Sequence, residues 1–156
     1  RGIILDNRDV IKDYGNHLLD SLNKRINFLN NVIQKLELSN VKAIHGRAED
    51  LAKIVQHREK YDIVISRAVA PFNVLLEYML PFNKVNSYTI AMKGSNIEEV
   101  DISNNALKKL GGKIEKIEEI TLPNSDIKRN IIIVKKVKNT PSKYPRKPGT
   151  PSKEPI

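Results

Sequence analysis

Segments with the periodicity of strands alternate with segments with the periodicity of helices along most of this chain, and this alternation restricts its fold more than any other feature. The clearest strand is residues 61–66 (YDIVIS), a β-branched apolar run typical of a strand buried on both faces. The clearest helix is residues 22–38, where apolar residues recur every three or four positions after the N-cap candidate Ser21. The pattern predicts an α/β domain with a mainly parallel sheet.

The other predicted elements extend this sheet and its helices. Further strands are predicted at residues 17–20, 41–46, 87–94, 113–123 and 128–137, the last two as an antiparallel pair. Shorter helices are predicted at residues 47–56, between Pro71 and Pro81, and in the second half of 96–112, where Gly111 ends the helix. Residues 7–15 suit either a loop or a weak helix. We therefore divide the chain into an unassigned segment (1–16), an α/β domain (17–138) and a basic tail (139–156).

Two acidic residues stand where a ligand is expected, because ligands of parallel sheets bind at the carboxyl ends of the strands. Asp20 ends the predicted strand 17–20, where a carboxylate accepts hydrogen bonds from ribose hydroxyls. Its alternative role is to cap the helix that follows. Glu49 follows the strand 41–46 and is expected on the rim of the same cleft, near an adenine. Its alternative role is that of a first-turn acid favoured by the helix dipole.

Two basic residues end the next two strands. Arg67 follows the buried strand 61–66 and precedes apolar residues, so solvation alone explains it poorly. It either pairs with a buried carboxylate or faces an anionic ligand group. Lys93 directly precedes Gly94, and it either approaches a phosphate or carboxylate or lies on the surface with its stem buried.

The positive charge is concentrated near the C-terminal end. The chain has 27 Lys and Arg residues against 18 Asp and Glu, a net charge of +9, and residues 128–156 hold nine of the basic residues and one acid. Such a one-sided segment is typical of a nucleic-acid binder, and a solvated tail is the alternative. Prolines keep this tail extended, and Tyr144 is expected to stack on a base. The candidate RNA-binding residues are Lys93, Arg129, Lys143, Tyr144, Arg146 and Lys147.

Composition excludes several classes of protein. The chain has no cysteine, which excludes disulfides, thiolate metal sites and cysteine nucleophiles. Its three histidines (His17, His45 and His57) are scattered in the sequence, so we predict no metal site. No apolar run approaches the roughly 18 residues of a membrane span, and the N-terminal residues are unlike a signal peptide. These features predict a soluble, cytoplasmic monomer with no membrane partner.

Several segments together resemble a known family: LLDSLNKRINFLN, HGRAED, YDIVISRAVAPF, AMKG, RNIIIVKK and the closing YPRKPGTPSKEP. They resemble the bacterial 16S ribosomal RNA guanine-N7 methyltransferases, the RsmG family, also called glucose-inhibited division protein B. The resemblance implies a class I methyltransferase (Rossmann-like) fold with an antiparallel C-terminal strand. It also implies S-adenosylmethionine as the cofactor and 16S rRNA or the small ribosomal subunit as the partner. By the same resemblance Ala48 and Glu49 match the adenine end of the cofactor pocket, Asp20 the acid near the ribose, and Arg67 an arginine of that pocket.

The chain departs from this family before residue 17. The family's glycine-rich cofactor loop, expected just before the strand that ends at Asp20, is absent, because Gly15 is the only glycine between Gly2 and Gly46. We therefore expect an N-terminally incomplete fold, with residues 2–6 (GIILD) as the candidate for the place of the missing first strand. If that place were unfilled, a central edge of the sheet would be unpaired.

The chemistry that the resemblance implies asks for no catalytic base. Guanine N7 is an acceptor with a free lone pair, so methyl transfer from a sulfonium requires positioning rather than removal of a proton. No catalytic residue is assigned for this reason. Three functions remain open: a methyltransferase, a non-catalytic RNA-binding fragment of such an enzyme, and a generic nucleotide-binding α/β protein.

Overall fold

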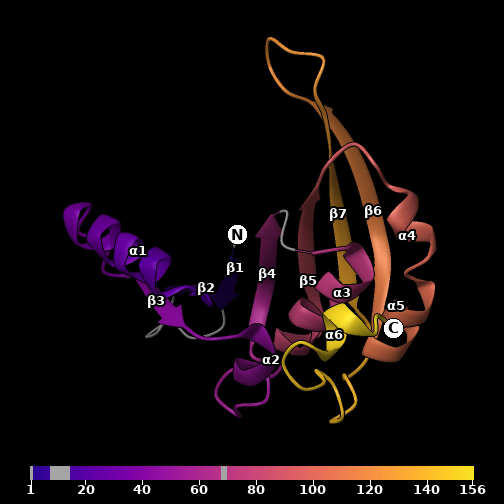
Figure 1. Cartoon of the computed structure of the whole chain (residues 1–156), viewed down its shortest axis with the longest axis horizontal. Helices are drawn as coiled ribbons and strands as arrows, with labels where there is room; N and C mark the ends of the chain where they lie inside the picture. Colours follow the sequence, from indigo (N-terminus) through magenta and orange to yellow (C-terminus); the bar gives the residue numbers. More distant parts are fainter. Residues whose placement is uncertain (1, 8–14, 68–69) are drawn as a thin grey trace.

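The strands of this protein form one sheet in the order β3-β2-β1-β4-β5-β7-β6 (Figure 1). The computed structural model describes residues 2–7, 15–67 and 70–156. The loop or weak helix predicted before Gly15 therefore lies, for residues 8–14, outside the described residues. The strand order reverses between β1 and β4, and in open α/β sheets ligands bind at such a switch point.

Five of the seven strands in the described ranges run in the same direction. The strands are β1 (Ile3–Asn7), β2 (Gly15–Asp20), β3 (Val41–His45), β4 (Tyr61–Arg67), β5 (Asn83–Lys93), β6 (Gly112–Thr121) and β7 (Lys128–Lys136). The pairing registers show that only β1 and β7 run opposite to the others. The central place of β4 and the antiparallel pair of β6 and β7 are as predicted.

Strand β1 fills the centre of the sheet, but in the reverse direction. The place predicted for residues 2–6 is confirmed, because β1 lies between β2 and β4 and leaves no central edge open. Ile3 pairs with Leu19 and Ser66, whereas Asn7 pairs with Gly15, so the amino end of β1 lies beside the carboxyl ends of its neighbours. The sheet is therefore mixed. The prediction had one antiparallel strand, at the C-terminal end, and the structure has β1 as a second.

Helices cover the two faces of the sheet unequally. They are α1 (Asn23–Lys35), α2 (Ala48–Leu51), α3 (Phe72–Met79), α4 (Glu98–Asp101), α5 (Asn104–Leu110) and α6 (Thr150–Lys153), with a 3-10 turn η1 (Leu80–Phe82) after α3. The core lies on the side of α3 and α5, where Leu5, Val64 and Ile132 are fully buried. Helix α1 packs on β2 and β3, and on its side Ile4 and Met92 stay 37% and 39% exposed.

Two predicted helices differ from the observed ones at their ends. Helix α1 follows the N-cap Leu22, so the predicted cap Ser21 is wrong; Asp20 Oδ1 instead accepts a hydrogen bond from the Leu22 N–H at 2.8 Å. The helix predicted at 47–56 ends at Leu51 and continues as turns. Val55, in those turns, is 76% exposed, so a longer helix would have no apolar face to bury there.

The basic tail is docked on the body. Figure 1 shows the C-terminal segment running beside α2, α3 and α5, with α6 next to α3. Tyr144 is 6% exposed and belongs to the hydrophobic core, so its ring is not placed to stack on a base as predicted, and the alternative of a solvated tail does not hold for this residue either. In the described ranges we find no helix with the length and apolar character needed to cross a membrane.

Candidate cofactor-binding site

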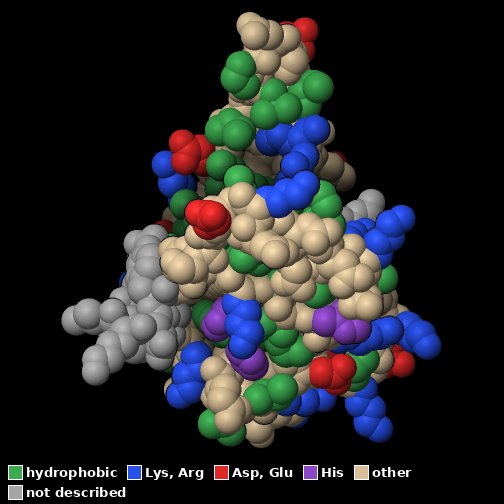
Figure 2. Space-filling model, turned by 90° about the vertical axis from the view of Figure 1, so that its left-hand side faces the viewer, with side chains coloured by type: hydrophobic (Ala, Val, Ile, Leu, Met, Phe, Trp, Pro, Cys, Tyr) green, Lys and Arg blue, Asp and Glu red, His purple; other side chains and the backbone are tan. Residues whose placement is uncertain are grey.

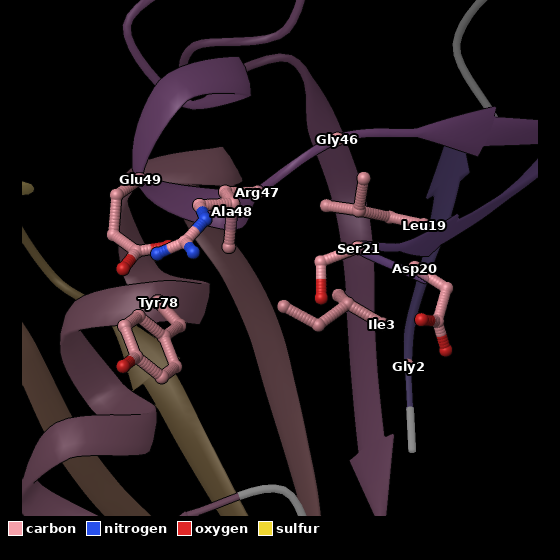
Figure 3. A pocket seen from close by; sticks show the side chains of 10 residues that line it. All are labelled: Gly2, Ile3, Leu19, Asp20, Ser21, Gly46, Arg47, Ala48, Glu49 and Tyr78. Atoms are coloured by element: carbon pink, nitrogen blue, oxygen red, sulfur yellow. The ribbon is translucent and has the colours of Figure 1, made fainter. Parts of the chain in front are cut away.

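A cleft of about 270 Å³ opens at the carboxyl ends of β2 and β3, beside the amino end of β1 (Figure 3). Figure 3 shows Glu49 and Tyr78 on one wall, and Ile3 and Asp20 on the other. Ala48 lies between the two walls at the start of α2. Three of the four residues predicted to bind the cofactor, Asp20, Ala48 and Glu49, therefore line a single cleft.

Asp20 has a structural role at this cleft. Its carboxylate is 6% exposed; Oδ1 accepts the hydrogen bond from Leu22, and Oδ2 accepts one from the Arg25 guanidinium at 3.2 Å. The capping alternative is not met as such: α1 has Leu22 as its N-cap and no side-chain cap hydrogen bond, and Asp20 instead fixes the turn that leads into the helix. Each carboxylate oxygen has a further lone pair, so contact with ribose hydroxyls is compatible with this role and stays a prediction.

Glu49 and Tyr78 are both held by the C-terminal segment. Glu49 is 6% exposed in the first turn of α2, and its Oε1 accepts a hydrogen bond from the Gly149 N–H at 3.2 Å. The Tyr78 hydroxyl, on α3, lies 2.8 Å from the Ser152 hydroxyl. Glu49 is thus more than a first-turn acid, because it joins the cleft to a segment 100 residues away in the sequence.

Arg67 lies outside this cleft, at the carboxyl end of β4. It lines a second cavity of about 470 Å³ on the α1 side of the same sheet edge, a cavity that Asp20 and Phe28 also line. Its side chain is exposed and forms no hydrogen bond or ion pair with any other described residue. Pairing with a buried carboxylate is therefore not observed, and contact with an anionic ligand group stays a prediction. Next to it, the buried Ser66 hydroxyl has no hydrogen-bond partner among the described residues.

Lys93, at the end of β5, is held by the protein itself. Its ammonium forms an ion pair with Glu99 at 3.0 Å and donates a hydrogen bond to the Ala70 carbonyl at 2.7 Å. Glu99 also accepts a hydrogen bond from the Phe72 N–H at 2.8 Å. This arrangement fixes the start of α3, and the ammonium is already satisfied without a phosphate.

The predicted RNA-binding residues of the tail fall into two groups. Tyr144 is in the core, and Arg146 is bound to the buried Glu77 at 2.7 Å, so the structure uses both side chains internally. Lys143 and Lys147 are exposed, and the Lys143 ammonium lies 5.3 Å above the Tyr144 ring. Arg129 is half-buried on β7 and donates to the Lys128 carbonyl.

Two of the histidines come together although they are distant in the sequence. His17 Nδ1 and His57 Nδ1 lie 2.8 and 2.6 Å from the Tyr61 hydroxyl. Burial lowers the pKa of both imidazoles and raises the pKa of Tyr61 to about 12. Figure 2, which looks onto the α1 and β3 side, shows histidines there with Lys and Arg side chains nearby. No group of three or more potential metal ligands occurs within the described ranges.

Sequence reasoning missed Glu77 and Tyr78. Glu77 is 1% exposed, and the signal for it was an acid within the apolar run of residues 74–80. Tyr78 gave no such signal, because an aromatic residue on an apolar helix is ordinarily part of the core.

Comparison with known proteins identifies the relatives of this chain. The family model described as "GidB: rRNA small subunit methyltransferase G" matches residues 2–132. The chain belongs to this family. The ribosomal RNA small subunit methyltransferase G of Acetivibrio thermocellus is 58% identical over 139 residues, which are 89% of this chain and 57% of that protein. The protein of the same name from Alkaliphilus metalliredigens is 55% identical over 140 residues, 89% of this chain and 59% of the relative. The GidB chain thus spans less than two thirds of the length of these relatives.

Solved structures support the fold of this GidB chain. M. jannaschii TYW2 in complex with AdoMet superposes with a TM-score of 0.57 at 14% identity, covering 78% of this chain and 57% of that one. An rRNA methylase from Streptococcus thermophilus gives a TM-score of 0.55 at 14% identity, covering 78% and 73%. The fold is therefore of the class I methyltransferase type, as predicted.

Membership of the GidB family implies S-adenosylmethionine as the cofactor. The residues of the cleft fit its nucleoside portion better than its amino-acid portion. Asp20 and Glu49 supply carboxylate oxygens, the acceptors that ribose hydroxyls and an adenine amino group require. At the other end, the reversed β1 brings Gly2 to the carboxyl end of β2, and no glycine-rich loop is present there. A Cβ on Gly2 would lie 2.7 Å from the Leu19 carbonyl oxygen, so Gly2 serves close packing against β2 rather than space for a ligand.

Proposed function

We propose that this chain binds S-adenosylmethionine and acts in the cytoplasm on N7 of a guanine in 16S rRNA. The observation that carries the proposal is the cleft that brings Asp20, Ala48 and Glu49 together at the carboxyl edge of the sheet in a member of the GidB family. The generic nucleotide-binding alternative is less well supported, because family membership extends over residues 2–132.

In this proposal, different residues bind the nucleoside portion and the methionine portion of the cofactor. Asp20 accepts hydrogen bonds from the ribose hydroxyls, while Ala48 and Glu49 hold the adenine. Arg67, which lines the neighbouring cavity and has no partner among the described residues, faces the carboxylate of the methionine portion. When bound, S-adenosylmethionine supplies an activated methyl group on its sulfonium.

The residues of this chain would contribute binding and orientation rather than proton transfer. The lone pair of guanine N7 needs no deprotonation, so an aligned approach of the base supplies most of the rate enhancement. A groove of about 590 Å³, lined by Arg67, Lys93 and Arg129, adjoins the second cavity, which Arg67 also lines. Its basic side chains make it a suitable place for the RNA strand. The exposed Lys143 and Lys147 would add phosphate contacts on the tail.

One observation favours a second candidate function. Because β1 is reversed and Gly2 is packed against β2, the amino-acid end of the cofactor lacks the loop that the family uses. A chain that holds the nucleoside weakly and still binds RNA through its basic residues would be a non-catalytic RNA-binding member of the family.

Isothermal titration separates these functions. The wild-type chain is titrated with S-adenosylmethionine, with 5′-methylthioadenosine, which lacks the amino-acid portion, and with an oligonucleotide of 16S rRNA sequence. We expect binding of all three, and Arg67→Ala should weaken S-adenosylmethionine about tenfold or more while changing RNA affinity less than threefold.

The outcomes are distinct. A folded sample that binds RNA but neither nucleoside contradicts the cofactor proposal and favours the RNA-binding fragment. Equal losses of cofactor and RNA affinity in Arg67→Ala would refute the role given to Arg67. Nucleoside binding without RNA binding would support the generic nucleotide-binding alternative.

A further inference from the structure

The C-terminal segment 139–156, the strap, reaches the wall of the cleft that is proposed to bind the nucleoside. We propose that the strap positions Glu49 and Tyr78, so that the affinity of the cleft for a nucleoside depends on Gly149 and Ser152. The inference rests on the proposed cofactor binding and adds to it residues that line no part of the cleft. Four sets of contacts carry it, and they follow one another along the strap.

The strap is first anchored on the turn before β4. The Arg58 guanidinium donates hydrogen bonds to the Thr140 and Tyr144 carbonyls, each at 2.8 Å. The neighbouring Glu59 accepts a hydrogen bond from the Thr140 N–H at 2.8 Å and another from Asn139. Backbone carbonyls of the strap are thus paired by one arginine, and the Thr140 N–H and the Asn139 side-chain amide by one glutamate, which fixes the path of the strap where it leaves β7.

The second anchor is an ion pair at α3. The Glu77 carboxylate, 1% exposed, accepts hydrogen bonds from the backbone N–H of Arg146 at 2.8 Å and from its guanidinium at 2.7 Å. A buried carboxylate without a partner is strongly disfavoured, so this contact holds the middle of the strap against α3. Tyr144, buried between the two anchors, adds apolar packing.

The third and fourth contacts are on the cleft wall itself. Gly149 has a φ of +86°, a left-handed conformation suited to glycine, and its N–H donates to Glu49. The turn at Gly149 starts α6, which brings the Ser152 hydroxyl to 2.8 Å from the Tyr78 hydroxyl. Figure 3 shows Glu49 and Tyr78 on one wall, with the Arg47 side chain beside Glu49.

These contacts hold the side chains of Glu49 and Tyr78 in place. Among the residues that the structure describes, the Glu49 carboxylate and the Tyr78 hydroxyl each have a strap residue as their only hydrogen-bond partner. Without the strap, both side chains would sample other rotamers and would have to be ordered when the nucleoside binds, at the expense of affinity. The strap therefore acts by preorganising the wall.

The test uses Ser152→Ala, Tyr78→Phe and the double variant, titrated with 5′-methylthioadenosine and with S-adenosylmethionine. Loss of one positioning hydrogen bond should weaken both ligands by about threefold to tenfold. Because both changes remove the same bond, the double variant should lose little more than the single ones. Ser152→Thr, which keeps the hydroxyl, should restore wild-type affinity, and the exposed Lys153→Ala on the same turn is the matched control.

Thermal unfolding of each variant separates positioning from folding. Ser152 is exposed, so its loss should leave the unfolding midpoint within about 2 °C of wild type while affinity falls. Unchanged affinity in Ser152→Ala, with a wild type that binds nucleosides, overturns the role of the strap and leaves the proposed function intact. A folded wild type that binds no nucleoside overturns the proposed function and the inference together.

Discussion

Glu77 is the residue on which the docking of the strap depends most. Its carboxylate is almost fully buried on α3, and Arg146 supplies its charge partner. The hydrogen bond to Glu77 raises the pKa of the Arg146 guanidinium, so this side chain stays charged at any ordinary pH. A buried pair of this kind is costly to break on one side, because the remaining charge is left without compensation.

Arg146→Ala should therefore destabilise the protein by about 3–5 kcal/mol, since it keeps only the backbone N–H as a donor and leaves the buried Glu77 carboxylate without a charge partner. Replacing both residues by methionine should cost much less, because no charge is then left in the core. Urea denaturation of both variants measures the difference, with Lys147→Ala as the exposed neighbouring control. A single variant no less stable than the control would show that the strap does not depend on this pair.

The His17–Tyr61–His57 cluster should make stability sensitive to acid. Burial lowers the pKa of both imidazoles, with the charges of His57 and Lys42 adding to the effect at His17 and that of Lys42 at His57, so the folded protein favours neutral rings around the Tyr61 hydroxyl. A histidine whose folded pKa is lowered takes up its proton more readily when unfolded, so stability is full above about pH 6.5 and falls as the pH drops through the lowered pKa values.

Urea midpoints at pH 7.5 and pH 5.5 test this expectation. The wild type should lose more stability on acidification than a His17→Gln, His57→Gln variant, in which the imidazoles are gone. Parallel losses in the two proteins would mean that other groups govern the acid response. His45, whose Nε2 lies 3.1 Å from the Ser21 carbonyl oxygen on another part of the surface, supplies the control substitution His45→Gln.

At the scale of elements, β1 decides how complete the sheet is. Its side chains alternate, with Leu5 fully buried on the core side and Ile4 37% exposed on the α1 side. A slip of one residue in the register would exchange these faces. The direction and register of β1 are thus tied to a specific pattern of burial.

Leu5→Ala should destabilise the protein by about 2–5 kcal/mol, because it opens a cavity in the core between β2 and β4. Ile4→Ala should cost clearly less, since that side chain is already partly in water. Equilibrium unfolding of both variants measures the contrast. Equal effects would indicate another register of β1, and a negligible effect of both would indicate that β1 does not stabilise the sheet.

Elements with a strong local pattern were predictable, and those defined by distant contacts were not. The apolar run at 61–66 and the apolar spacing of α1 identify β4 and α1 from local residues alone. The direction of β1 could not be predicted, because a short apolar strand reads equally well in both directions. The same limit applies to the strap, whose many prolines carry no apolar periodicity and whose position depends on Arg58 and Glu77.

The candidate site was predicted in part for the same reason. Asp20 ends β2 and Glu49 comes shortly after β3, so the positions of the strand ends were enough to predict that both lie at one sheet edge. Tyr78 reaches the cleft from α3, and its contact with Ser152 depends on how α6 packs, which no local pattern encodes.

At the scale of the whole molecule, the charge distribution bears on the RNA partner. Residues 128–156, which comprise β7 and the tail, carry most of the net charge of +9, but docking of the tail uses Arg146 internally and leaves Lys143 and Lys147 exposed. The basic surface is therefore smaller than the composition suggests, and it is fixed in place beside the cleft rather than carried on a free arm.

Lys143→Ala and Lys147→Ala should each weaken RNA binding across sequences, and each should reduce the slope of log affinity against log salt by about 1. Titration of an rRNA oligonucleotide at several salt concentrations measures that slope. Lys113→Ala on β6, a lysine outside the strap, is the comparison. Slopes that match wild type in both strap variants would remove these lysines from the RNA interface.

The strap also affects the order in which the protein can be completed. Synthesis proceeds from the amino end, so α2 and α3 leave the ribosome well before residues 146–152 exist. Until then Glu77 has no guanidinium, and Glu49 and Tyr78 have no partners, since their contacts join positions separated by 69, 100 and 74 residues. The wall formed by Glu49 and Tyr78 is accordingly among the last parts of the molecule to form, and under the proposed function a nascent chain would bind a nucleoside only after the body of the sheet has assembled.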